Sequence, residues 1–215
     1  MYNILCFGDS NTFGTNPSGG RWDRNQRWTG LLQQRLGSGF YVIEEGLGGR
    51  TATSEDFLEP DKNGYRHLPV ALRSHRPLDL VILMLGTNDM KHRFALLPED
   101  IAQGAAQLGR LAETYDYGPG YSIPKILLVS PIHIEPGIEH SVFTGFSADA
   151  VEISHKLAPL YRAHAEANSW LYLNAADLAQ ASQKDKLHME AEGHLALAQA
   201  IGDIILKTFP RSFSR

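Results

Sequence analysis

Five short apolar runs recur along the chain and are separated by longer segments, and this alternation constrains the fold more than any other feature. The runs, rich in branched residues, span residues 4–7, 41–43, 80–85, 126–129 and 170–173. Continuous apolar runs of this length are typical of strands that are buried on both faces of a parallel sheet. We therefore predict a β-strand at each run.

The segments between the runs show the spacing of amphipathic helices. Apolar residues recur three or four positions apart in residues 28–36, 101–111, 153–161 and 190–206. Such spacing places them on one face of a helix. Strands that alternate with helices predict parallel strands joined by right-handed crossovers. The predicted fold is of the α/β class: a flavodoxin-like, three-layer α/β/α sandwich around a five-stranded parallel sheet.

One domain accounts for the whole chain. A length of 215 residues fits one large domain better than two. Three stretches rich in glycine and proline, at residues 16–20, 118–124 and 136–145, show no shift in composition that would mark a linker. We predict a single domain over residues 1–215, in which these three stretches are surface loops that shape the rim of a pocket.

Charge and cysteine content narrow the functional class. The formal net charge is -4 and no basic run occurs, which argues against a nucleic-acid partner. The single cysteine, Cys6, lies in an apolar run and is predicted to be a buried core residue. The first residues lack the features of a signal peptide, and no apolar run reaches the roughly 18 residues that span a bilayer. We expect a cytoplasmic protein with no membrane partner.

Polar residues collect directly after the predicted strands. They lie in residues 8–11, 46–51, 86–89 and 130–131, and in residues 185–188 before the last helix. A turn, a helix cap or a surface ion pair explains each cluster taken alone. All of them, however, fall at the carboxyl edge of the predicted sheet, where open parallel sheets bind their ligands. Their joint placement predicts a catalytic site at this edge.

Ser10, His188 and Asp185 have the side chains of a nucleophile, a base and the acid that orients the base. A serine hydroxyl becomes nucleophilic when an imidazole accepts its proton, and a carboxylate fixes the tautomer of that imidazole. The backbone N–H groups of Ser10 and Gly49 and the amide of Asn88 can donate to the oxyanion that such an attack forms. We predict Ser10, Asp185 and His188 as catalytic residues and Ser10, Gly49 and Asn88 as the oxyanion hole.

Two acidic residues next to these candidates are predicted to support them. Asp9 and Asp89 are expected to brace loops by accepting backbone hydrogen bonds. A metal site is not predicted, because His188 and His194 are six residues apart and so do not share one helix face as ligands four residues apart would. No cofactor is predicted either.

Other residues at this edge admit two interpretations. Arg50 and Lys91 are assigned to a solvated rim in preference to steering an anionic substrate. Phe143 and Phe146 line an acyl pocket or cover a subunit interface. Residues 46–49 have glycines like those of a dinucleotide turn, but Thr51 stands where the third glycine of that motif belongs, so phosphate binding is disfavoured.

These segments together resemble the SGNH hydrolases, also called GDSL-type esterases and lipases. Ser10 within residues 7–14 looks like the family's first block, and Gly49 and Asn88 fall at the glycine and asparagine of the second and third blocks. Asp185 and His188 match the last block, in family order over nearly the whole chain. The resemblance implies an α/β fold and the hydrolysis of esters through an acyl-enzyme without a cofactor.

Within that family the chain is most similar to bacterial arylesterases with acyltransferase activity. The likeness is carried by residues 27–30, 42–47, 50–51, 78–82 and 84–89. It implies hydrolysis of small acyl esters, acyl transfer to an alcohol or to peroxide, and a homo-oligomer.

Two residues depart from the pattern: Asn11 replaces a leucine of the nickname motif, and Thr15 stands where the acyltransferase branch has a tryptophan near its acyl pocket.

We expect the chain to be a serine esterase that hydrolyses short-chain aryl or acetyl esters, and its expected partner is a small-molecule substrate. A non-catalytic module that binds glycans or acylated ligands on the same fold is the alternative.

Overall fold

The computed structural model describes residues 1–209 and contains a five-stranded parallel sheet with the strand order β2-β1-β3-β4-β5. Its strands are β1 (Tyr2–Gly8), β2 (Phe40–Gly46), β3 (Leu80–Met84), β4 (Lys125–Ser130) and β5 (Leu171–Asn174). The predicted fold class is confirmed, although the ends of the strands differ from the predicted runs by up to three residues. Residues 210–215 of the predicted domain lie outside the described residues.

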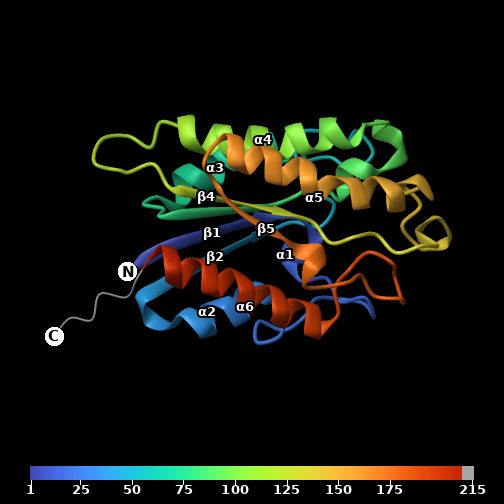
Figure 1. Cartoon of the computed structure of the whole chain (residues 1–215), viewed down its shortest axis with the longest axis horizontal. Helices are drawn as coiled ribbons and strands as arrows, with labels where there is room; N and C mark the ends of the chain where they lie inside the picture. The colour runs from blue at the N-terminus through green and yellow to red at the C-terminus, as the bar shows by residue number, and fades with distance from the viewer. Residues whose placement is uncertain (210–215) are drawn as a thin grey trace.

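Helices cover both faces of the sheet (Figure 1). On one face lie α2 (Trp28–Leu36) and α6 (Ala191–Thr208), and on the other lie α3 (Gly64–His75), α4 (Pro98–Thr114) and α5 (Asp149–Ala167). The remaining helical turns are α1 (Ser10–Phe13), η1 (Gly37–Gly39), η2 (Asn88–Met90), η3 (His92–Phe94), η4 (Ile138–His140) and η5 (Ala175–Asp177).

The hydrophobic core has two halves, one on each side of the sheet. Successive strand residues point to opposite faces, so Leu5 packs under α3, α4 and α5 while Cys6 packs above α2 and α6. Cys6 is fully buried, as the sequence predicts, and burial raises the pKa of its thiol. Both faces of β1 are therefore covered by helices, which explains its continuous apolar run.

Helix α3 is the one long helix that the sequence pattern does not predict. It contains Pro69, a residue that ordinarily ends or kinks a helix because it lacks an N–H donor. The Asn63 side chain caps the helix by accepting a hydrogen bond from the N–H of Arg66. Leu68 and Leu72 face the core, and their burial holds the helix in place in spite of the proline.

The strand order brings three distant segments to one point. The chain leaves β1 for β2 on one side and then returns to β3 on the other, so the ends of these strands form a topological switch point. In register, Gly8 at the end of β1 lies beside Gly46 of β2 and Met84 of β3. The segments that follow these three strands therefore meet at the same edge.

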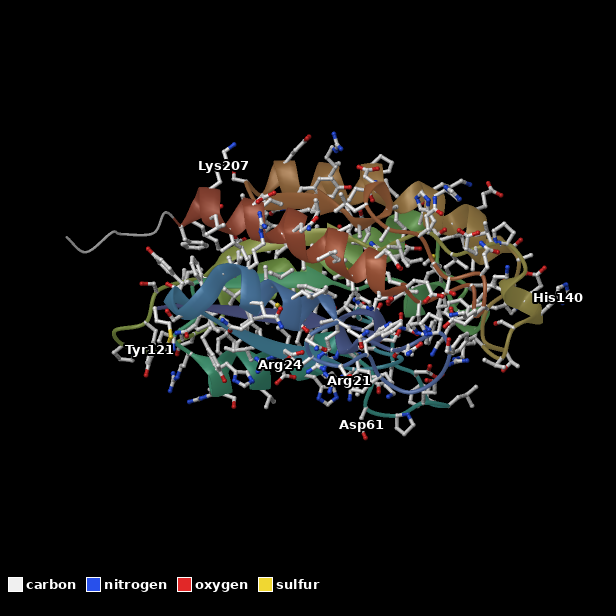
Figure 2. All side chains as sticks on the ribbon, turned by 90° about the horizontal axis from the view of Figure 1, so that it is seen from below. Arg21, Arg24, Asp61, Tyr121, His140 and Lys207 are labelled. Atoms are coloured by element: carbon white, nitrogen blue, oxygen red, sulfur yellow. The ribbon has the colours of Figure 1, made fainter. Side chains whose placement is uncertain are left out.

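One of the three predicted rim loops lies at the wrong end of the sheet. The 118–124 loop precedes β4, so it belongs to the amino ends of the strands, whereas the 136–145 loop follows β4. Figure 1 shows the two loops at opposite sides of the molecule, and Figure 2 likewise places Tyr121 and His140 at opposite ends. The prediction that residues 118–124 shape the pocket rim is therefore wrong.

Across residues 1–209, none of the helices combines the length and the apolar character that crossing a membrane requires.

Candidate active site

Ser10 stands at the first position of α1, immediately after β1. Asp9 precedes it as the helix cap, and its side chain accepts a hydrogen bond of 2.9 Å from the N–H of Asn11. The turn requires glycine at position 8, because a Cβ atom there would lie 2.8 Å from the backbone carbonyl oxygen of Met84 and 2.1 Å from Oγ1 of Thr12. This tight turn presents the Ser10 side chain to a cavity at the edge of the sheet.

His188 and Asp185 form a buried pair in the loop before α6. Nδ1 of His188 lies 2.7 Å from Oδ2 of Asp185, and the other carboxylate oxygen accepts the N–H groups of Leu187 and His188, each at 3.0 Å. Burial acts to raise the pKa of Asp185, but these hydrogen bonds and the imidazole outweigh it and lower the pKa below its ordinary value. The carboxylate thus stays charged and leaves Nε2 as the free ring nitrogen.

Ser10 and His188 line the same cavity. In the described part of the chain no hydrogen bond joins the Ser10 hydroxyl to the imidazole, whose Nδ1 is held by Asp185. The Phe143 ring packs against the imidazole in a T-shaped arrangement, with 5.3 Å between the ring centres. The arrangement therefore brings the proposed nucleophile and the proposed base to one cavity.

Asn11 joins the serine turn to the histidine loop. Its side-chain amide accepts the N–H of Met189 at 3.0 Å and donates to the carbonyl of Leu187 at 3.3 Å. These two residues flank His188, so the amide grips the backbone on both sides of it. No pattern in the sequence indicates this contact, because nothing local relates position 11 to a loop more than 170 residues later.

Gly49 and Asn88 lie beside Ser10 in the cavity wall. Gly49 has a φ of 81°, a conformation that favours glycine. One hydrogen of the Asn88 amide goes to the carbonyl of Arg50 at 3.1 Å, which leaves its second hydrogen free. Within residues 1–209 the N–H groups of Ser10 and Gly49 have no hydrogen-bond acceptor. The structure thus gathers the three predicted donors at one cavity.

Arg50 fastens the Gly49 turn to the sheet. Its Nη1 donates to the carbonyls of Gly8 and Glu45, and its guanidinium lies 4.0 Å from the centre of the Phe7 ring. Burial lowers the pKa of Arg50 to about 10. The predicted solvated rim position is therefore wrong for Arg50, because its charged group is turned inward beneath the site rather than outward to solvent.

Asp9 and Asp89 are buried, and each accepts a hydrogen bond from a backbone N–H group. Asp89 accepts the N–H of Ala52 at 2.8 Å and the hydroxyl of Ser54 at 3.1 Å, which ties the segment after Gly49 to the turn that carries Asn88. Burial raises the pKa of Asp9 to about 6, although its bond to Asn11 counteracts this. Burial likewise raises the pKa of Asp89.

The cavity has a volume of about 340 Å³ and two unlike walls. Phe143, Phe146 and Leu187 form an apolar wall, so both phenylalanines line the cavity that contains Ser10. Glu59 and Lys91, with Arg93, form a charged wall. Glu59 and Arg93 were missed in the sequence because they lie in irregular segments without a motif.

Two further expectations about the rim are wrong. Lys91 lines the cavity but is buried rather than solvated, because its ammonium is held 2.6 Å from a carboxylate oxygen of Glu59. Thr15 also lines the cavity, whereas residues 16–20, which were predicted to shape its rim, do not.

His194 points away from the cavity into the core. Its Nδ1 accepts the N–H of Trp28 at 3.3 Å. Burial lowers the pKa of His194 to about 4, and the nearby His188 and Arg27 add to this effect. Over residues 1–209 the histidine, cysteine and acidic side chains form no group of three or more that is suited to holding a metal ion.

Comparison with known families matches the sequence to one of them. The model of the GDSL-like lipase/acylhydrolase family matches residues 6–196, which include all the residues placed around the cavity. The chain belongs to this family. The resemblance seen in the sequence is thereby confirmed, as is the prediction of a carboxylic ester hydrolase.

Solved structures support the same assignment. The chain is 38% identical to Est24, a carbohydrate acetylesterase from Sinorhizobium meliloti, with a TM-score of 0.91 over 97% of this chain and 100% of that one. It is 37% identical to the aryl esterase from M. smegmatis, with a TM-score of 0.90 over 96% and 99% of the two chains. A search of the curated proteins gave no match.

Proposed function

We propose that this hydrolase cleaves short-chain carboxylic esters through an acyl-enzyme formed on Ser10. The Ser10 oxygen attacks the ester carbonyl while Nε2 of His188 takes its proton and passes it to the departing alcohol. Asp185 holds the imidazole and stabilises its protonated form. Water, deprotonated by His188, then attacks the acyl-enzyme and releases the acid. The observation that supports this scheme most is the 2.7 Å pair of Asp185 and His188 in the cavity that also contains Ser10.

The proposed oxyanion hole is formed by three donors. The backbone N–H groups of Ser10 and Gly49 and the free amide hydrogen of Asn88 would stabilise the charge that develops on the carbonyl oxygen. A hydrogen bond to the carbonyl of Arg50 already orients the Asn88 amide, so little reorganisation accompanies the reaction.

The cavity supports a small acyl group. A volume of about 340 Å³ is at the low end for small-molecule sites, and the apolar wall of Phe143, Phe146 and Leu187 suits a short hydrocarbon chain. The similar structures are named as a carbohydrate acetylesterase and an aryl esterase. We therefore propose acetyl and other short acyl esters as substrates, with aryl or sugar alcohols as the leaving groups.

A panel of chromogenic esters with increasing acyl length tests this function, run on the wild type and on Ser10→Ala. We expect turnover that is highest for acetyl and propionyl esters and is lost in Ser10→Ala. If the two proteins were equally inert on the whole panel, the alternative of a non-catalytic glycan or acyl-ligand binding module would replace the proposal.

Acyl transfer to an alcohol or to peroxide is proposed as a side activity, on the strength of the resemblance alone. Thr15 lines the cavity at the position where the acyltransferase branch has a tryptophan. The ratio of transfer product to free acid, measured in the presence of an added alcohol, tests this activity.

The homo-oligomeric state and the cytoplasmic location stay predictions. Light scattering tests the oligomeric state, and cell fractionation tests the location.

A further inference from the structure

Four charged side chains form a cluster in and behind the charged wall of the cavity. Asp56 and Glu59 come from the loop after the Gly49 turn, and Lys91 and Arg93 come from the segment after Asn88. Nζ of Lys91 and Nη2 of Arg93 each lie 2.6 Å from Oε1 of Glu59. The Arg93 guanidinium also donates hydrogen bonds to both carboxylate oxygens of Asp56. The proposed ester hydrolysis uses none of these four groups.

The four groups differ in how far they reach toward solvent. The Asp56 side chain is fully buried, those of Lys91 and Arg93 are 6% and 26% exposed, and that of Glu59 is 42% exposed. Glu59 is therefore the outermost charge of the cluster. Burial acts to raise the pKa of Glu59, but Lys91 and Arg93 outweigh it and lower the pKa, so this carboxylate is ionised at neutral pH.

Glu59 also stands close to the proposed oxyanion hole. A Cβ atom added to Gly49 would lie 2.8 Å from Oε2 of Glu59, so this oxygen is packed against the Gly49 backbone. An ester whose carbonyl oxygen is held by Gly49 would bring its substituents near this carboxylate. The positively charged groups of Lys91 and Arg93, which lie behind this carboxylate, are already paired with Glu59 and Asp56.

We propose that Glu59 makes the site selective for the charge of its substrate: it pairs with Lys91 and Arg93 and thereby restricts the site to neutral esters. Without the Glu59 carboxylate, the two positive charges of Lys91 and Arg93 would face only the one negative charge of Asp56. The charged wall would then have a net positive charge and could bind an anion. The inference rests on the proposed function, because the ester must be bound beside Gly49 to feel this charge. Charge repulsion over a few ångströms in a partly buried site changes affinity tenfold or more.

The substitution Glu59→Gln tests the proposal, because it removes the charge and keeps the shape. Two matched pairs of esters are the probes: 4-acetoxybenzoate against 4-acetoxybenzamide, and monoethyl succinate against ethyl butyrate. They place the negative charge on the alcohol side and on the acyl side. For at least one pair, we expect kcat/KM for the anionic ester divided by kcat/KM for the neutral ester to be about tenfold or more higher in Glu59→Gln than in the wild type. The increase should come from a lower KM for the anionic ester. Added salt should reduce this gain.

Glu55→Gln is the matched control. Glu55 lies in the same loop and pairs with Arg66 at 2.9 Å, but it does not line the cavity. This variant changes the net charge equally and is expected to leave the ratio at its wild-type value. An equal rise in both variants would show a general charge effect and would overturn the proposal.

Other outcomes also count against the proposal. It is overturned if the ratio stays unchanged for both pairs in Glu59→Gln, or if the wild type already prefers the anionic esters. If Glu59→Gln does not fold, Arg93→Gln is the second variant. The ratio of kcat/KM for the anionic over the neutral ester is then expected to fall, because less positive charge neutralises Glu59. A rise in this ratio would contradict the proposal. Failure of the wild type to cleave either neutral ester would instead count against the proposed function.

Discussion

At the scale of single residues, the three proposed oxyanion donors are held in different ways. The main chain fixes the N–H groups of Ser10 and Gly49, whereas a side-chain torsion and one hydrogen bond to Arg50 place the amide of Asn88. Asn88 is therefore the donor whose contribution a substitution can remove without altering the backbone.

Asn88→Ala should reduce kcat for a short-chain ester on the order of 10² to 10³-fold. The loss falls on kcat because the amide acts on charge that develops in the transition state, and KM should change little. Steady-state kinetics with a chromogenic acetate ester measures both constants. Unchanged turnover in a folded variant would show that Asn88 is not an oxyanion donor.

Asp9 links the site to stability through its raised pKa. Burial raises the pKa of Asp9 from an ordinary 3.8 to about 6, so the folded protein disfavours its ionised form. As pH rises through this window the unfolded chain loses the proton first, and stability decreases. A difference of about two units corresponds to about 3 kcal/mol.

Asp9→Asn should therefore increase the free energy of unfolding, because the amide oxygen can still accept the N–H of Asn11 while no charge is buried. The gain over the wild type should be small near pH 4 and reach up to about 3 kcal/mol by pH 8. Urea unfolding at a series of pH values measures it. A gain that does not vary with pH would contradict the assigned titration.

At the scale of elements, the junction between α1 and the 185–189 loop decides how the nucleophile and the base face each other. Asn11 makes both of its hydrogen bonds across this junction, to the backbone on each side of His188. A small displacement of a catalytic group can reduce turnover as much as 10²-fold.

Asn11→Leu, which restores the leucine of the family's nickname motif, should lower kcat about 10- to 100-fold with little change in KM. It leaves the buried N–H of Met189 without its partner, which should also lower the free energy of unfolding by about 1–3 kcal/mol. Kinetics and urea unfolding on the same sample measure the two effects. Loss of stability with full kcat would show that Asn11 supports the fold and does not position His188.

Element by element, the apolar runs predicted every strand, because burial on both faces leaves a continuous signal in the sequence. Helix α3 was missed because Pro69 disguises a segment that Leu68 and Leu72 anchor to the core. The 118–124 loop was misplaced because composition marks a loop but does not say which end of the sheet it occupies. The position of each loop relative to the neighbouring strand would have shown at which end of the sheet it lies, because a loop before a strand lies at the amino edge.

At the scale of the whole molecule, one sheet carries both halves of the core. Strand residues contribute alternately to the cluster under α3, α4 and α5 and to the cluster above α2 and α6, so neither half is complete without the sheet. The predicted single domain should unfold in one cooperative transition. Far-ultraviolet and near-ultraviolet circular dichroism and residual activity should give coincident urea curves. Separate midpoints would show two independently folding units.

The location of the candidate site could be predicted from the sequence because parallel strands deliver the residues that follow them to one edge. Ser10, Gly49 and Asn88 each follow a predicted strand, so the sequence assigns all three to that edge. The partners of buried charges could not, because Lys91 and Glu59 meet through loop conformations that no periodicity determines. This is why Arg50 and Lys91 were assigned to a solvated rim.

The central claim is that the Asp185–His188 pair activates Ser10, and labelling with an ester-mimicking fluorophosphonate tests it most directly. Mass spectrometry should find one adduct per chain, on the peptide that contains Ser10. The adduct should be absent in Ser10→Ala and should form far more slowly in His188→Ala, because the serine then lacks its base. An adduct on another residue, or equal labelling rates in the wild type and His188→Ala, would contradict the account.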